Sequence, residues 1–174
     1  MKKKLILCCF IGLLLPGCDD RDDDSKDMEK PDIDMSGSDA SPQNCVVLYR
    51  GEHFSFRATF TDNQELGNYN IEIHNNFDHH SHSTDHVECD QEPKKSPVNA
   101  FVYNRDFSIP SGKTRFEADN EIAIPADVDT GDYHFMVRVT DKAGWQQLRA
   151  VSLKIAEKTE GQYRRSSDSY PVQR

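Results

Sequence analysis

Two stretches of the sequence alternate regularly between apolar and polar residues, and this alternation limits the fold more than any other feature. Successive side chains of a β-strand point to opposite faces, so the pattern predicts strands with one face in a core. The inward positions are Phe54, Phe56, Ala58 and Phe60 in the first stretch, and Tyr133, Phe135, Val137 and Val139 in the second. His53 is then expected on the surface, and His134, Met136 and Arg138 are expected to face outward.

Five more segments have a strand-like composition. They are residues 45–48, 69–73, 101–109, 116–125 and 148–155. In the strand at 69–73 the apolar residues are expected inward, which turns the following His74 outward. About seven short strands with no convincing helix predict an all-β fold, an antiparallel β-sandwich that spans residues 44–157.

Turn residues separate the predicted strands. Turns are expected at residues 61–63, 130–132 and 141–144, and Gly144 would supply a positive φ. Asp and Asn hydrogen-bond to their own backbone in such turns. We therefore assign Asp62, Asn63 and Asp141 to turns, in preference to a calcium site.

The N-terminus has the pattern of a targeting segment. Three lysines precede an apolar run at residues 5–15 that is too short to span a bilayer. The sequence LPGC at residues 15–18 resembles a bacterial lipobox, which implies that residues 1–17 are a signal peptide and that Cys18 carries acyl chains such as palmitate. The other interpretation is an ordinary secretory signal with an incidental cysteine.

Residues 18–43 are expected to be a disordered tether behind the lipidated cysteine. The stretch from Asp19 to Asp34 contains nine acids and three bases, and too few apolar residues to offset the entropy of ordering. Acids in this position resemble the surface-export signal of Bacteroidota lipoproteins, although a simple spacer is the alternative. Residues 158–174 are expected to be a disordered tail.

The charge of the chain argues against a nucleic-acid partner. The formal net charge of −9 falls to −12 when the three lysines of the signal peptide are removed. Nucleic-acid binding depends on neutralisation of phosphates by lysine and arginine, so it is not expected here.

Two of the five cysteines remain once the signal peptide and the lipidated residue are set aside. These are Cys45 and Cys89, and an exported domain with two cysteines usually pairs them. The alternative is that Cys89 is a thiolate ligand of a metal, because it lies three residues after His86. We favour the disulfide because the compartment is oxidising.

Residues 74–86, HNNFDHHSHSTDH, are the segment with the most distinctive chemistry. They include five of the seven histidines, two aspartates and no lysine or arginine. Neutral imidazole is the commonest metal ligand in proteins and suits zinc, copper or nickel. The predicted ligands, in decreasing order, are His74, His134, His80 and His82, with His79 and His86 in reserve and Asp78 as an oxygen ligand or as an acceptor that orients a ring. The other interpretation is a polar, solvated loop.

Residues 131–144, GDYHFMVRVTDKAG, resemble the penultimate strand and final hairpin of immunoglobulin-like domains, with Tyr133 at the position of the corner tyrosine. This resemblance implies that the third and sixth strands are antiparallel neighbours. His74 ends the third strand and His134 begins the sixth, so their Cβ atoms would lie about 4.5–5.5 Å apart. A short return of the loop would then bring His80 or His82 to the same place.

A narrower resemblance covers nearly the whole mature domain. The lipobox, the acidic tether and three motifs resemble an uncharacterised lipoprotein family of the Bacteroidota, known as a domain of unknown function. The motifs are FTDNQELG at 60–67, IHNNFDHHSH at 73–82 and GDYH at 131–134. The resemblance implies an immunoglobulin-like fold and a place in the cell envelope, as an outer-membrane lipoprotein exposed at the surface. It implies no activity.

The sequence supports two functional hypotheses. The first is a lipid-anchored protein whose domain binds a zinc or copper ion through the clustered histidines. The second is a non-catalytic immunoglobulin-like module for adhesion or interaction with an envelope protein, without a metal. A metalloenzyme, in which a three-histidine site with an open position activates water, is a third interpretation, but it is not expected, because no nucleophile motif or general base with a partner is evident.

Overall fold

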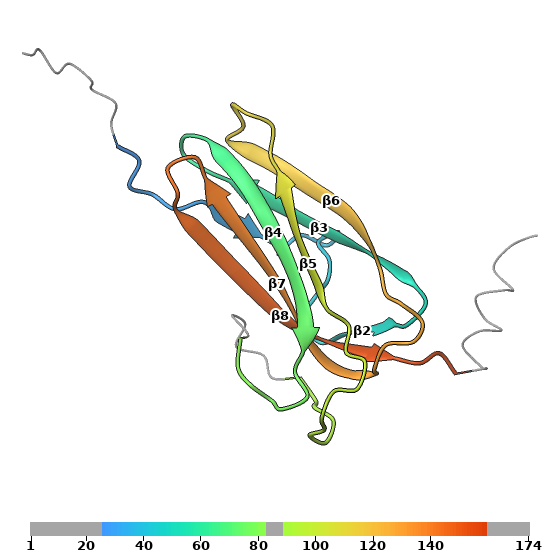
Figure 1. The fold of residues 1–174 in the computed structure, drawn as a ribbon. Coiled ribbons are helices and arrows are strands. Elements are labelled where there is room, and N and C mark those ends of the chain that lie inside the picture. The colour runs from blue at the N-terminus through green and yellow to red at the C-terminus, as the bar shows by residue number, and fades with distance from the viewer. Residues whose placement is uncertain (1–25, 83–88, 160–174) are drawn as a thin grey trace, which may run out of the picture.

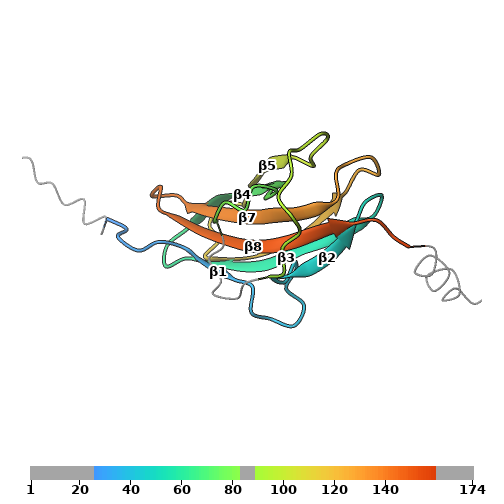
Figure 2. The ribbon, with the colours of Figure 1, turned by 90° about the horizontal axis from the view of Figure 1, so that it is seen from below.

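The computed structural model describes residues 26–82 and 89–159, which form a β-sandwich of two facing sheets (Figures 1 and 2). The three-stranded sheet has the order β1 (Asp32–Asp34), β3 (His53–Thr61), β6 (Arg115–Ala123). The five-stranded sheet has the order β2 (Val46–Tyr49), β8 (Gln146–Ala156), β7 (Gly131–Asp141), β4 (Leu66–Asn75), β5 (Tyr103–Ser108). The described residues contain no helix, hence none long and apolar enough to cross a membrane.

The predicted β-sandwich is confirmed, with two differences in detail. The structure has eight strands, and β2 pairs with β8 in parallel whereas the other pairs are antiparallel. The predicted signal peptide, Cys18, His86 and the tail beyond residue 159 lie outside the described residues.

The additional strand lies in the segment that was expected to be a disordered tether. β1 pairs with β3, and the side chains of Ile33 and Met35 are buried in the core. Here the acids Asp32 and Asp34 alternate with these apolar residues. The net charge of the region predicts disorder, but two inward side chains at a spacing of two are enough to add an edge strand. The folded domain therefore begins before residue 44.

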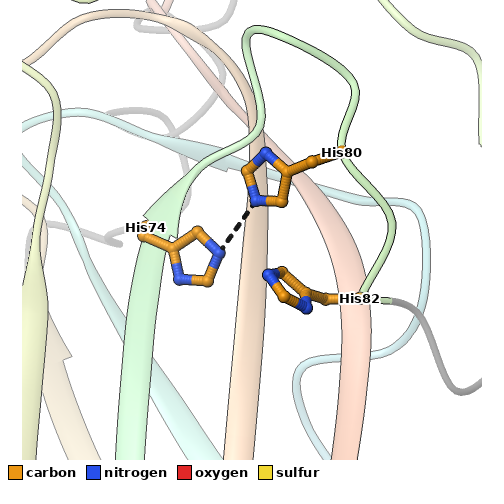
Figure 3. Close-up of side chains that lie close together, drawn as sticks. All are labelled: His74, His80 and His82. Atoms are coloured by element: carbon orange, nitrogen blue, oxygen red, sulfur yellow. Dashed lines mark hydrogen bonds between the residues drawn. The ribbon is translucent and has the colours of Figure 1, made fainter.

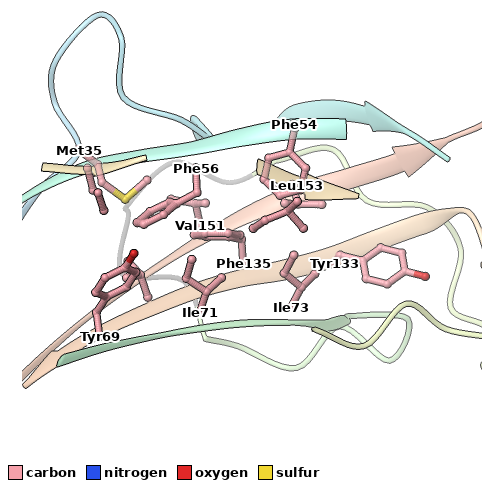
Figure 4. Packing of buried hydrophobic residues seen from close by; sticks show 14 of the residues in the cluster. Met35, Phe54, Phe56, Tyr69, Ile71, Ile73, Tyr133, Phe135, Val151 and Leu153 are labelled. Atoms are coloured by element: carbon pink, nitrogen blue, oxygen red, sulfur yellow. The ribbon is translucent and has the colours of Figure 1, made fainter. Parts of the chain in front are cut away.

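The core lies between the sheets and contains the residues expected from the alternation. Figure 4 shows Phe54 and Phe56 of β3 facing Ile71 and Ile73 of β4 across the sandwich. His134 and Met136, which were expected outward, are only 2% and 8% exposed. The outer face of β7 is therefore covered where the strand begins, and for His134 the cover is the loop that follows β4.

Tyr133 makes the contacts of a corner tyrosine. Its hydroxyl donates to the carbonyl oxygen of Asp129 at 2.7 Å and accepts from the backbone N–H of Phe101 at 3.2 Å. The predicted turn at 130–132 is shorter than expected, since β7 already begins at Gly131. These contacts fix the start of β7 relative to the adjoining loops, and they therefore also fix the position of His134.

Two of the four edge strands, β6 and β5, carry exposed charged side chains. On β6 the residues Glu117, Asp119 and Glu121 are exposed, and on β5 Arg105 and Asp106 are exposed. Among the described strands, β6 and β5 each pair with one neighbour only.

The antiparallel pair β4 and β7 defines two ends of the molecule. The end of β4 lies beside the start of β7, where the long loop at residues 76–102 begins. At the opposite end the turn between β3 and β4 meets the turn between β7 and β8. Figure 1 shows the described N-terminal segment in blue beside this second end.

Candidate metal centre

The strand register places two histidines side by side. His74 of β4 and His134 of β7 are paired directly across the ladder, as the sequence predicted. Their ring centroids are 5.7 Å apart. Each lies at the end of its strand that adjoins the long loop, so the loop can close over the pair.

The loop after β4 is anchored by a buried aromatic side chain. Phe77 is 2% exposed and its ring meets that of Tyr133 edge to face at 5.3 Å. Gly131, at φ 125°, lies under this ring, and a Cβ atom there would approach Phe77 to 3.0 Å. The backbone N–H of Asn76 also donates to the carbonyl of Asp132 at 2.7 Å. The next residues are therefore fixed above His134 rather than extended into solvent.

Four imidazole rings converge at this place, and we call them the histidine cluster: His74, His80, His82 and His134. Every pair of ring centroids is 4.9–5.7 Å apart. Figure 3 shows His80 and His82 on the loop, turned toward His74 at the end of β4. Each of these three offers a ring nitrogen, and those nitrogens lie within 4.8 Å of one another.

Carboxylates hold two of the rings. Nδ1 of His74 lies 3.0 Å from a carboxylate oxygen of Glu72, and Nδ1 of His80 lies 2.5 Å from a carboxylate oxygen of Asp78. The hydrogen bond between His80 and Asp78 is the largest of the causes that lower the pKa of Asp78, and a lower pKa favours the ionised carboxylate. An ionised carboxylate only accepts hydrogen bonds, so Nδ1 of each ring donates and Nε2 is left with a lone pair in the neutral ring.

The two free nitrogens face each other. Nε2 of His74 is 3.2 Å from Nε2 of His80, as the dashed line in Figure 3 shows. Two nitrogen ligands on one tetrahedral zinc, with bonds of 2.0–2.1 Å, are separated by about 3.3–3.4 Å. The spacing in the protein, 3.2 Å, is close to that separation, and it is also within the range of a hydrogen bond between the two rings.

His134 has a different place in the cluster. Its Nε2 lies 3.0 Å from the carbonyl oxygen of His80 and donates to it, which ties the loop to β7. Its Nδ1 is buried and has no hydrogen-bond partner among the described residues. Neither nitrogen joins the set within 4.8 Å, so the ring forms the floor of the cluster and positions His80.

Burial favours the neutral form of two of the rings. Desolvation lowers the pKa of His74, against an opposing effect of Glu72, and desolvation also lowers the pKa of His134. The neutral form of imidazole is the one that binds metals.

The remaining predicted residues lie elsewhere or act differently. His79 has a φ of 61° and its Nε2 donates to the carbonyl of Glu92 at 2.8 Å, so its ring leaves the cluster. Asp78 serves as the acceptor for His80. His86 lies outside the described residues, and His53 is exposed on the other sheet.

Cys45 and Cys89 form the disulfide that the sequence favoured. Cys89 is therefore not a thiolate ligand. The bond attaches the far side of the histidine-rich segment to the residue before β2, 44 positions away in the chain.

Sequence reasoning missed Glu72. Residues i and i+2 of a strand share a face, so Glu72 lies beside His74 on the outer surface of β4. That spacing was a usable signal for the acceptor.

Lys95 also borders the hollow next to the cluster, but it contacts other groups. Its ammonium group donates to the carbonyl of Thr130 and lies over the ring of Phe77.

Comparison with solved structures finds low overall similarity. A mutant of the SrpA adhesin from Streptococcus sanguinis is 16% identical with a TM-score of 0.42, over 83% of this chain and 61% of that one. The GspB Siglec domain is 18% identical with a TM-score of 0.40, over 82% and 73%. The sporulation control protein Spo0M from Bacillus subtilis is 11% identical with a TM-score of 0.36, over 75% and 49%. The chain thus spans less than two thirds of SrpA and of Spo0M.

Comparison with curated proteins found no match. A sequence family does match, however, and it covers residues 17–156, which is most of the chain and all eight strands. The chain therefore belongs to the family described as a domain of unknown function, DUF4625.

Proposed function

We propose that this domain binds a transition-metal ion, zinc or copper, through His74, His80 and His82. One observation carries the proposal: Nε2 of His74 and Nε2 of His80 lie 3.2 Å apart. In both rings Nδ1 is hydrogen-bonded to a carboxylate, so Nε2 is the nitrogen left to bind a metal. Two lone pairs that face each other at this distance repel, and a cation between them removes the repulsion.

A proton shared between the rings is the competing explanation. It would make one ring an imidazolium, because both Nδ1 atoms already carry hydrogen. Desolvation lowers the pKa of His74 and so disfavours its charged form at neutral pH. A metal ion satisfies both lone pairs without protonating either ring.

The ligand set favours zinc or copper over a hard cation. Three imidazole nitrogens suit the borderline metals, and no thioether or thiolate is contributed by the described residues at this site. Glu72 and Asp78 would hold the tautomers and offset the charge of the ion. His82 is exposed, so the ion would be reached from solvent and could be exchanged.

The envelope role that we propose is the capture or buffering of metal by a lipid-anchored domain. It is supported by the lipobox-like sequence at residues 15–18 and by the acidic residues that follow it. The membrane would be contacted through Cys18 and its acyl chains.

Calorimetric titration of the tag-free chain with zinc and with copper tests the proposal. We expect one ion per chain for the native protein. His74→Ala and His80→Ala should each weaken binding by more than the roughly 10- to 100-fold that follows loss of an outer hydrogen-bond partner. The exposed histidine on the other sheet provides the control, so His53→Ala should leave the affinity unchanged. A dissociation constant no tighter than about 1 mM for both metals would contradict the proposal.

A further inference from the structure

Three segments distant in the sequence bring carboxylates together at the end of the sandwich opposite the histidines. Asp27 lies before β1, Asp62 lies in the turn between β3 and β4, and Asp141 ends β7. Each contributes a carboxylate oxygen that lies within 4.8 Å of those of the other two. We call these residues the acidic cluster.

The turns account for one oxygen of each turn aspartate. Oδ1 of Asp62 accepts from the backbone N–H groups of Gln64 and Glu65 at 2.9 and 2.7 Å. Oδ1 of Asp141 accepts from those of Gly144 and Trp145 at 2.6 and 2.8 Å. These are the turn contacts that the sequence predicted, and they fix the orientation of both carboxylates.

The second oxygens have no such explanation. Oδ2 of Asp62 and Oδ2 of Asp141 are buried and have no hydrogen-bond partner within the described part of the chain. Asp141 is only 4% exposed, and none of the ion pairs between described residues involves the acidic cluster. A buried carboxylate oxygen without a donor is unfavourable unless a water molecule or a cation satisfies it, and three carboxylates that meet at one place favour the cation.

Asp27 is held in the cluster by other contacts. It is 7% exposed, and its Oδ1 accepts from the side-chain amide of Asn63 at 3.0 Å and from the backbone of Glu29 at 3.0 Å. The indole N–H of Trp145 donates to its carbonyl oxygen at 3.0 Å. The N-terminal segment is therefore fastened to both turns, although it has the composition of a solvated linker.

We propose that Asp27, Asp62 and Asp141 bind a calcium ion. Calcium takes six to eight oxygen ligands and tolerates irregular geometry, so three carboxylates with water molecules suit it, whereas zinc prefers nitrogen or sulfur. The ion offsets two of the three negative charges and joins the segment at residue 27 to the two turns. It thereby fixes the direction in which the chain enters the domain. This site is independent of the histidine cluster.

The single tryptophan of the chain allows a local test. Trp145 contacts both Asp27 and Asp141, so a terbium ion bound in place of calcium is expected to give luminescence sensitised by this indole. Calcium should displace terbium and remove the signal, with a dissociation constant in the range of about 0.1–1 mM that is typical of extracellular modules. Absence of the sensitised signal, or a signal that excess calcium leaves unchanged, would overturn the proposal.

Substitution by asparagine distinguishes the effect of ion binding from the effect of the turn contacts. Asp62→Asn combined with Asp141→Asn retains Oδ1 for the backbone contacts but removes two charges. In the full chain, 10 mM calcium is expected to raise the melting temperature of the native protein by about 5–10 °C, and that of the double variant by less than about 1 °C. Asp127→Asn, at an exposed position, should behave as the native protein.

Zinc titration of the same variants distinguishes this proposal from the function proposed above. The double asparagine variant should bind zinc with native affinity, and His74→Ala should retain the full response to calcium. An equal calcium response in native and double-variant protein would overturn the calcium site, whatever the outcome of the zinc titration.

Discussion

The two ends of the β4–β7 pair gather ligand atoms by different routes. At the histidine end, two side chains meet through strand register and a loop adds two more from nearby in the sequence. At the acidic end, two turns meet and the third residue arrives from 35 positions before Asp62. The first arrangement offers nitrogen and the second offers oxygen, so under the two proposals one scaffold would separate a site for borderline metals from a site for a hard cation.

The first way to break this comparison is to release the loop at the histidine end. Phe77→Ala removes a buried ring that packs on Tyr133, and it should lower the free energy of unfolding by about 3–5 kcal/mol. Denaturant unfolding measures this loss. Zinc affinity should fall while calcium affinity stays unchanged. Leu66→Ala, buried near the acidic end, is the control: it should destabilise the fold and leave zinc affinity intact.

Loss of the disulfide should have the next largest effect on the free energy of unfolding. Replacing Cys45 and Cys89 by serine opens a loop of 44 residues, and we expect a loss of about 2–4 kcal/mol in unfolding free energy. The bond lies on the side of the histidine-rich segment, so zinc binding should weaken more than calcium binding. Equal weakening of both affinities would show that the two ends are coupled.

Removal of the carboxylate beside His74 sharpens the comparison without unfolding either end. Glu72→Ala should weaken zinc binding by about 10- to 100-fold, because the ring loses the acceptor that fixes its tautomer. Glu117→Ala, an exposed glutamate on β6, provides the matched control and should have no effect. Native zinc affinity in Glu72→Ala would remove this residue from the site.

The smallest expected effect is a pH dependence of stability in the metal-free chain. Burial lowers the pKa of His74 and of His134, so near and below pH 6.5 the unfolded state binds more protons than the folded state. The contribution is present above the ordinary histidine pKa and is lost as the pH falls through the lowered values. His80, His82 and Glu72 lie beside these two rings. Urea midpoints in chelator should be lower at pH 5.5 than at pH 7.5, and a flat profile would contradict the burial argument.

The sequence predicted the histidine end because the information there is local. Alternation of apolar residues fixes which way His74 points, and the pairing of β4 with β7, expected from the resemblance to immunoglobulin-like domains, puts it beside His134. His80 was ranked above His79, but the structural reason for this order was out of reach, since it depends on a positive φ at His79 and on the anchor at Phe77. The burial of His134 was missed for the same reason, because it is the folded loop that covers the ring.

The acidic end shows where such reasoning fails. Asp62 and Asp141 were correctly assigned to turns, but each aspartate has a second oxygen that a turn does not use. Asp27 lies in a run whose composition predicts disorder, and only the contacts with Asn63 and Trp145 reveal that it is held in place. A high density of charge predicts that a segment is solvated and disordered. It does not reveal a single residue, such as Asp27, that is held by several hydrogen-bond donors.

The charged margin β6 and the short margin β1 of the three-stranded sheet have a consequence for crowding at a surface. Antiparallel contact between the β6 strands of two copies would align Glu117, Asp119 and Glu121 with like charges, and β1 presents only three residues to a neighbour. Such margins oppose strand addition and the growth of fibrils. The three-stranded sheet is thereby protected from edge-to-edge association at high local density.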